Sequence, residues 1–212
     1  MKILKRVSIL IGILSISLIP FNAAQAWTES DLPIHTTTIG EYRDNGELNF
    51  PVGIAIDNSN NIYISEGYNN RIQKFTSEGS YLTKWGNYGT NNGQFNGQYG
   101  VTVDEDSNVY VADTVNQRIQ KFDSSGNFLL KFGSFGSDNG QFYLPVTVTI
   151  DTKGNMYVAD AFLNRIQKFD SSGNFLLKFG SSGSDDGQFN FPYKIEIDSD
   201  GNMYVADTNN NR

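Results

Sequence analysis

The sequence predicts an all-β protein, a β-propeller of four-stranded antiparallel blades, of which about three and a half are present. Two observations predict this fold class. A 47-residue repeat runs without insertion from Leu48 to Arg212, and each copy contains four short runs of β-branched and aromatic residues separated by Gly, Ser, Asn and Asp. Because no part of the repeat has helical periodicity, a propeller blade is favoured over a solenoid unit.

Four positions keep the 47-residue spacing in every copy and set the blade boundaries. They hold an arginine, an aspartate, a tyrosine and a large apolar residue, namely Arg71, Arg118, Arg165 and Arg212; Asp57, Asp104, Asp151 and Asp198; Tyr63, Tyr110, Tyr157 and Tyr204; and Leu48, Phe95, Phe142 and Phe189. Residues 118–134 and 165–181 are identical. This register predicts blade 1 at 49–95, blade 2 at 96–142, blade 3 at 143–189 and the first half of blade 4 at 190–212.

The third copy illustrates the elements of one blade. We expect strands at 146–151, 155–159, 165–169 and 175–179, joined by tight turns. The first turn carries Gly154, with Asn60 and Gly201 at the same position in two other copies, and these residue types tolerate a positive φ. Ser107 in the second copy fits that requirement less well.

The first 26 residues have the three-part layout of a secretory signal peptide. Lys2, Lys5 and Arg6 form a basic start, residues 7–20 are apolar, and residues 24–26 form a small-residue cleavage signature. The apolar stretch is shorter than the roughly 20 residues of a membrane span, so we expect an exported protein, secreted or in the cell envelope, rather than an uncleaved anchor. A linker at 27–34 and a closing strand and loop of the last blade at 35–48 would follow.

Composition excludes several function classes. Removing the signal peptide leaves 13 Lys and Arg against 23 Asp and Glu, a net charge of −10, so nucleic-acid binding is not expected. The chain has no cysteine, and His35 is its single histidine. Zinc sites built from His and Cys, and nucleophiles activated by histidine, therefore cannot be assembled.

Residues 111–134 (VADTVNQRIQKFDSSGNFLLKFGS) and 192–212 (PYKIEIDSDGNMYVADTNNNR) resemble NHL repeats. The shared marks are the Asp-Gly-Asn turn, the Val-Ala-Asp end of the second strand, the Asn-Arg start of the third and the Gly-Gln-Phe linker between blades. The first copy departs at Ile64, Ser65 and Glu66 but keeps the acidic charge. The resemblance extends over residues 50–212 and implies a six-bladed propeller, so we expect a C-terminally truncated fragment whose partners include its own missing blades.

An acidic residue precedes each repeat arginine by five positions, across one hairpin turn. Because the pair recurs in every copy, structural ion pairs are favoured over a ring of ligand contacts, and they would join Glu66 to Arg71, Asp113 to Arg118, Asp160 to Arg165 and Asp207 to Arg212.

The turn at 198–202 resembles the opening of a calcium loop, but Asn209 stands where the bidentate acid of a full loop would be. A turn capped by Asp and Asn side chains explains all four copies and is favoured, with calcium as the alternative cofactor and no metal site assigned.

Positions that differ between copies are not dictated by blade packing, so they are either candidates for binding or positions that have drifted in unimportant loops. They lie in the turn before each arginine and at the start of each first strand, and the resemblance places both on one rim around the central channel. The rim candidates are Tyr68, Tyr99, Val115, Phe162, Leu163, Tyr193 and Lys194.

Two function hypotheses remain. The favoured one is an exported, non-catalytic propeller that acts as an interaction scaffold for a protein, peptide or glycan, as the resemblance implies. The alternative is a propeller enzyme of the lyase or lactonase type, with a channel metal completed by missing C-terminal blades. Glu196, where the other copies have Ala55, Thr102 and Thr149, is the single unusual acid on an inner strand.

Overall fold

The structure is a computed structural model that describes residue 39 and residues 46–212. The predicted signal peptide (1–26), the linker (27–34), His35 and most of the predicted closing segment at 35–48 lie outside the described residues. Within the described part of the chain, no helix is long and apolar enough to cross a bilayer.

The described residues form three four-stranded antiparallel sheets and one two-stranded sheet, each within one copy of the repeat. The strands are β1 (Pro51–Ile56), β2 (Ile62–Glu66), β3 (Arg71–Phe75) and β4 (Tyr81–Trp85); β5 (Val101–Val103), β6 (Val109–Asp113), β7 (Arg118–Phe122) and β8 (Phe128–Phe132); β9 (Pro145–Ile150), β10 (Met156–Asp160), β11 (Arg165–Phe169) and β12 (Phe175–Phe179); and β13 (Pro192–Ile197) and β14 (Met203–Asp207). Two short 3₁₀ turns, η1 (Thr114–Asn116) and η2 (Thr208–Asn210), follow β6 and β14.

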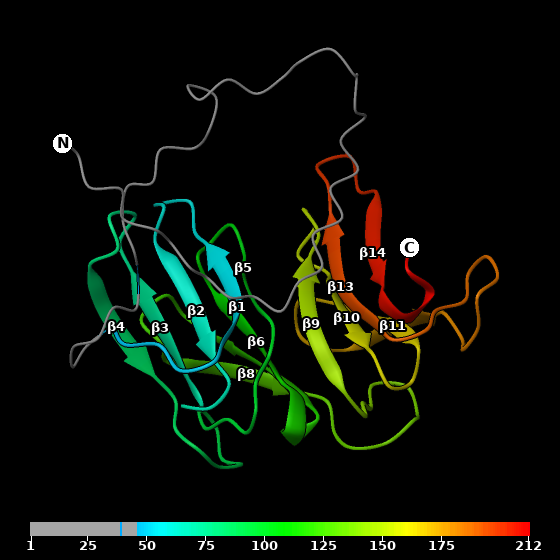
Figure 1. Cartoon of the computed structure of the whole chain (residues 1–212), viewed down its shortest axis with the longest axis horizontal. Helices are drawn as coiled ribbons and strands as arrows, with labels where there is room; N and C mark the ends of the chain where they lie inside the picture. The colour runs from blue at the N-terminus through cyan, green and yellow to red at the C-terminus, as the bar shows by residue number, and fades with distance from the viewer. Residues whose placement is uncertain (1–38, 40–45) are drawn as a thin grey trace.

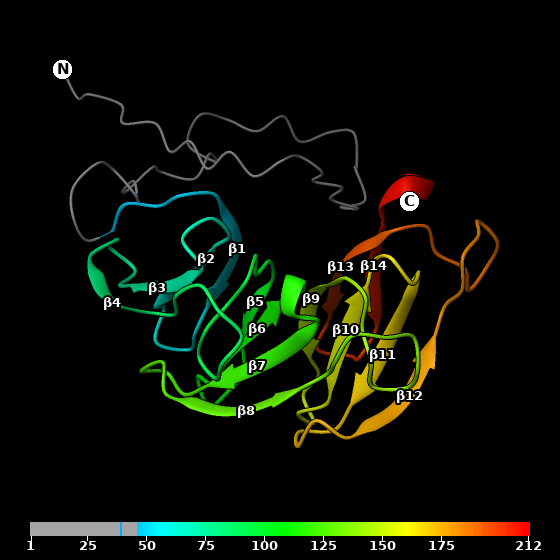
Figure 2. The same ribbon diagram turned by 90° about the horizontal axis from the view of Figure 1, so that it is seen from below.

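The sheets are arranged as the blades of a propeller. Strands pair in chain order within each sheet, and the first strands β1, β5, β9 and β13 contact one another from sheet to sheet. Figure 1 shows the first sheet on one side of the molecule and β13 and β14 on the other, and Figure 2 shows the sheets in an arc with β4, β8 and β12 on its outer side. The predicted fold class is therefore confirmed.

The strand boundaries of the third sheet agree with the sequence prediction to within one residue. In the third sheet β9 ends at Ile150 rather than at Asp151, because the Asp151 carboxylate accepts hydrogen bonds from the backbone N–H groups of Lys153 and Asn155 and so closes the turn. The second strand extends to Asp160, which pairs with Arg165 across the β10–β11 ladder.

The hydrophobic core lies between neighbouring sheets rather than within one. One cluster packs Tyr63 and Ile72 of the first sheet against Val109 and Phe122 of the second, and equivalent clusters join the second to the third and the third to β13. Since each sheet is covered by its neighbours, strict alternation of apolar and polar residues is lost on the middle strands.

The Phe of each Gly-Gln-Phe linker inserts into this core. Phe95 and Phe142 are fully buried, and each packs against a glycine that follows the fourth strand of the preceding sheet. A Cβ at Gly86, whose φ is +99°, would lie 2.5 Å from the ring of Phe95, so this position admits only glycine. The linker is thereby fixed against both sheets that it connects.

Candidate functional site

The predicted acid–arginine pairs form, and the structure shows that they do more than close their own turn. Arg118 Nε lies 2.7 Å from the Asp113 carboxylate, and its two Nη atoms donate to the backbone carbonyls of Thr90, Asn91 and Gln94 in the preceding linker. Gln120 adds a bond to the Gln94 carbonyl and accepts one from the Gly93 N–H. We call this arrangement the linker clamp.

The linker clamp recurs in the other sheets with one variation. Nε to carboxylate distances are 2.6 Å for Arg71 and Glu66 and 2.9 Å for Arg212 and Asp207, but 4.0 Å for Arg165 and Asp160. Arg165 still donates to carbonyls of its linker through both Nη atoms. Its buried Nε has no hydrogen-bond partner among the described residues.

The aspartate turns at the other end of each sheet are closed by their own hydrogen bonds. The Asp198 carboxylate accepts from the N–H groups of Asp200 and Asn202, from the Asn202 side chain and from the Tyr204 hydroxyl. The bond from the Asn202 side chain is the main reason that the pKa of Asp198 is lowered. In Asp104 burial alone would raise the pKa, and the bonds from Asn108 and Tyr110 outweigh it and lower the pKa.

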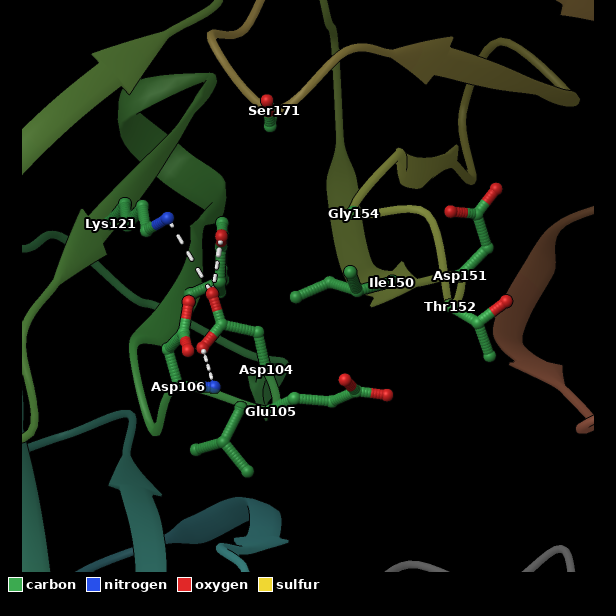
Figure 3. Close-up of a pocket in the computed structure, with 11 residues that line it drawn as sticks. Asp104, Glu105, Asp106, Lys121, Ile150, Asp151, Thr152, Gly154 and Ser171 are labelled. Atoms are coloured by element: carbon green, nitrogen blue, oxygen red, sulfur yellow. Dashed lines mark hydrogen bonds and ion pairs between the residues drawn. The ribbon is translucent and has the colours of Figure 1, made fainter.

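A cavity of about 340 Å³ lies between two of these turns, in the second and third sheets. Figure 3 shows that Asp104 turns toward Lys121, 3.5 Å away, while Glu105 extends toward Thr152. Among residues 39 and 46–212, no group of three His, Cys, Asp or Glu side chains is placed to hold a metal ion. The Asp198 carboxylate, which the sequence offered as a calcium ligand, serves as a hydrogen-bond acceptor in its turn.

A second cavity, of about 510 Å³, opens where the first strands of all four sheets converge. We call it the channel-mouth cavity. Three of the seven rim candidates line it: Tyr99, two residues before β5, and Tyr193 and Lys194 in β13. The rings of Tyr99 and Tyr193 meet edge to face at 6.2 Å, although they are separated by two repeats in the sequence. Burial and the neighbouring Tyr99 raise the pKa of Tyr193 to about 12.

Close backbone approach shapes this cavity. A Cβ at Gly53 would lie 2.7 Å from the Tyr99 carbonyl oxygen, and one at Gly100 would lie 2.8 Å from the Val146 carbonyl oxygen. The inner strands can therefore approach each other at these positions only because a side chain is absent. Lys194 occupies the equivalent position in β13 and forms an ion pair of 2.9 Å with Glu196, the acid that the sequence singled out.

The other four rim candidates lie on the turns after the second strands and do not line the channel-mouth cavity. Tyr68, Val115 and Phe162 are exposed, and Leu163 is half-buried. Tyr68 stacks on Phe50 with 4.4 Å between ring centroids, and Phe162 stacks on Tyr143 at 4.2 Å.

Sequence reasoning missed the aromatic partners of three rim candidates: Phe50 beside Tyr68, Tyr143 beside Phe162 and Phe191 beside Tyr193. All three lie at the ends of linkers, just before a first strand. The signal was present, because the equivalent positions in other copies hold Gly97 or Asn96, and disagreement between copies was the criterion already used for the rim.

Comparison with known proteins identifies the repeat and the fold. The NHL repeat profile matches residues 48–75 and 100–122. No curated protein sequence matches the chain. Among solved structures, a streptogramin B lyase has a TM-score of 0.60 at 16% identity, covering 77% of this chain and 50% of the lyase.

Two further structures are similar to a comparable degree. A virginiamycin B lyase from Staphylococcus aureus has a TM-score of 0.57 at 16% identity, with 75% of this chain and 49% of that chain covered. A protein of unknown function from Bacteroides thetaiotaomicron has a TM-score of 0.59 at 22% identity, with 74% and 44% covered. The chain thus spans about half the length of these structures, and the likeness concerns the fold alone. Its repeats and its blade architecture identify the chain as an NHL repeat-containing protein with a propeller-type fold.

Proposed function

We propose that the chain is an exported, non-catalytic binding propeller that recognises a protein, peptide or glycan ligand at the channel-mouth cavity. The observation that carries this proposal is the convergence of repeat-variable residues, Tyr99, Tyr193 and Lys194, on one cavity of about 510 Å³. A volume of this size lies within the range of ligand pockets, and the first strands supply a rigid frame for it.

The chemistry of the lining supports the same proposal. Most of the wall is apolar, including Val52, Val101 and Val146, while the Tyr99 and Tyr193 hydroxyls make no hydrogen bond within the described part of the chain. These hydroxyls are therefore free to orient a ligand on an apolar surface. Tyrosine combines contact area with a polar end at low entropic cost, which suits it to recognition surfaces.

The test uses substitutions that the repeat itself supplies. Val52 and Val146 stand where Tyr99 and Tyr193 stand, so the double variant Tyr99→Val and Tyr193→Val keeps a residue type that the strand already accepts. Peptide and glycan arrays probed with the full chain would identify ligands, and calorimetry would measure the affinity of both proteins. We expect the double variant to weaken binding at least about tenfold, a loss of roughly 1.4 kcal/mol.

The matched control is Tyr88→Ser, which introduces the residue of the equivalent position 182 at an exposed site outside the channel-mouth cavity. It should leave affinity unchanged. Equal affinity of the double variant and the unmodified protein would refute a binding site at the cavity.

A second candidate function is a lyase activity, favoured by the two lyases among the similar structures. The measurement is direct: the chain is incubated with a streptogramin B antibiotic, and the product is followed by mass spectrometry. On the binding proposal the antibiotic stays intact. Its turnover, abolished by substitution of residues in the channel-mouth cavity, would replace the binding proposal with the enzymatic one.

A further inference from the structure

The third sheet departs from the repeat at the rim by exchanging polar residues for apolar ones. One linker position holds Asn49, Asn96 and Asn190 in three copies but Tyr143 in the third. A position in the turn after the second strand holds Asn69, Asn116 and Asn210 in three copies but Leu163 in the third. Both changes fall in blade 3.

The second exchange removes a hydrogen-bond donor from the linker clamp. Asn69, Asn116 and Asn210 each donate their side-chain N–H to the acid of their own turn, at 2.7, 2.9 and 2.8 Å. Leu163 has no such donor. Asp160 keeps the bond from the backbone N–H of the linker residue, here Tyr143, that the acid accepts in the other copies, and it gains a bond from the backbone N–H of Leu144.

This rearrangement is unfavourable for folding. It accompanies the 4.0 Å separation of Asp160 and Arg165, whose buried Nε has no partner in the described chain. Burial outweighs the backbone bonds and raises the pKa of Asp160. A buried donor without a partner destabilises a fold, so local stability does not account for the apolar residues.

Tyr143, the first of the two exchanged residues, forms part of a continuous aromatic surface. The exposed fractions of Phe135, Tyr143 and Phe162 are 63%, 41% and 55%. Tyr143 stacks on Phe162 with centroids 4.2 Å apart and an interplanar angle of 18°, and its centroid lies 5.2 Å from that of Phe135. We call these three rings the aromatic platform. None of them belongs to the buried clusters between the sheets.

The linker that carries Phe135 also carries two polar side chains, and the nearest arginine of the linker clamp is not free. Asp138 and Asn139 are exposed in the linker that carries Phe135, and the Asn139 side chain has no hydrogen bond within the described residues. Arg165 commits both Nη atoms to backbone carbonyls. Burial lowers the pKa of Arg165, and the carboxylates of Asp160 and then Asp138 counter that effect.

These features restrict the ligand. An anionic ligand finds no free cation at Arg165, because both of its Nη atoms are already bonded to backbone carbonyls. A pyranose ring matches the surface, because one of its faces carries C–H groups that pack on aromatic rings, while its hydroxyls both donate to carboxylates and bond to amides.

We propose that the aromatic platform binds a neutral glycan, with one pyranose packed on Phe162 and Tyr143 and its hydroxyls bonded to Asp138 and Asn139. This inference rests on the proposed binding function but assigns the glycan to a site separate from the channel-mouth cavity.

The experiment measures binding of neutral hexasaccharides to the full chain by calorimetry. Four probes differ in sugar and linkage: β-1,4-glucose, β-1,3-glucose, β-1,4-mannose and β-1,4-N-acetylglucosamine. The variants are Tyr143→Asn and Phe162→Asn, which restore residues that other copies hold at these positions. The control is Tyr68→Asn, an exposed residue of blade 1 at the repeat position of Phe162.

We expect at least one hexasaccharide to bind, with affinity reduced at least about tenfold in both blade 3 variants, since each loses an aromatic contact. Affinity should be unchanged in Tyr68→Asn and in the Tyr99→Val, Tyr193→Val double variant. The proposal is overturned if no hexasaccharide binds at millimolar concentration, if the blade 3 variants bind normally, or if only a cationic peptide binds the platform. If hexasaccharide binding is lost only in the Tyr99→Val, Tyr193→Val double variant, the glycan site at the aromatic platform is overturned and the binding site at the channel-mouth cavity is supported.

Discussion

At the scale of single residues, the first turn of each repeat requires a positive φ at one position, and this requirement restricts the amino acids that fit there. The predicted positive φ of the first turn is confirmed, with values of +62° at Asn60, +64° at Ser107, +78° at Gly154 and +84° at Gly201. Ser107 adopts this conformation despite its side chain, because the Asp104 carboxylate accepts hydrogen bonds from the backbone on either side of it. The turn therefore holds Ser107 in a left-handed conformation that serine does not favour.

Replacing this serine by glycine should stabilise the protein. Ser107→Gly removes the steric penalty of a left-handed Cβ, and part of the gain is offset by the greater freedom of glycine in the unfolded chain. We expect the free energy of unfolding to rise by about 0.5–1 kcal/mol, measured by urea denaturation. The reciprocal control, Gly154→Ser, should lower it by a similar amount. A lower stability for Ser107→Gly would contradict the assignment of strain to this turn.

At the scale of elements, the linker clamp connects each sheet to the segment that precedes it. Arg118 bonds to the Asp113 carboxylate and to three backbone carbonyls that lie 24 to 28 positions earlier in the chain. A single guanidinium thus satisfies the polar groups of a linker that carries no regular secondary structure. Because the side chain of Arg118 is almost fully buried, these bonds are shielded from water.

The contribution of the linker clamp should depend on its burial. Arg118→Met leaves Asp113 buried without its charge partner, so we expect a loss of about 3–5 kcal/mol in the free energy of unfolding. Arg212→Met is the matched control, because the Arg212 side chain is 44% exposed and water can replace its bonds. Its loss should be less than half as large. Both are measured by urea denaturation, and equal losses would show that burial does not determine the strength of the clamp.

The sequence predicted the strands of these elements, but only part of their contacts. Strict spacing places Asp113 and Arg118 at the ends of one hairpin, so their pairing could be predicted from side chains alone. The backbone carbonyls that Arg118 binds could not be predicted, because every residue has a carbonyl and only the fold brings those of the linker close to the guanidinium. The aromatic platform was missed for a similar reason: Phe162 was a candidate, but its stacking on Tyr143 depends on the path of the linker before β9.

The same limit applies to the ring pairs of the first and fourth copies, Phe50 with Tyr68 and Phe191 with Tyr193. Phe50 and Phe191 have φ values of +54° and +59°, which bulky residues rarely adopt. This backbone conformation sets the direction of both rings, and no pattern of apolar residues predicts it. Tyr99 and Tyr193, by contrast, were found from their places at the starts of two first strands, which a propeller brings together around its axis.

At the scale of the whole molecule, the two ends of the sheets have different chemistry. One end carries the aspartate turns, and the other carries the channel-mouth cavity and the exposed rings of the rim. The aspartate end affects folding through its carboxylates, because the pKa values of Asp57, Asp104, Asp151 and Asp198 are all lowered. Hydrogen bonds to these carboxylates contribute to stability in every repeat, so their effect is spread over the whole propeller.

The stability of the protein should therefore fall in acid. A lowered pKa in the folded state means that the unfolded chain takes up protons more readily than the folded one. The contribution of these four aspartates to the free energy of unfolding is therefore fully present above the ordinary pKa of 3.8. It is lost as the pH falls through their folded pKa values. Asp160 acts in the opposite direction, because its pKa is raised by burial and its protonation favours the folded state. The pKa values of Glu78, Asp123, Asp170 and Asp207 are lowered as well. Because these carboxylates outnumber Asp160, the free energy of unfolding should decrease between about pH 5 and pH 2, measured by urea denaturation at each pH. Asp160→Asn removes the opposing contribution and should make the decrease steeper, whereas a stability that rises from pH 5 to pH 3 would contradict the role assigned to the aspartate turns.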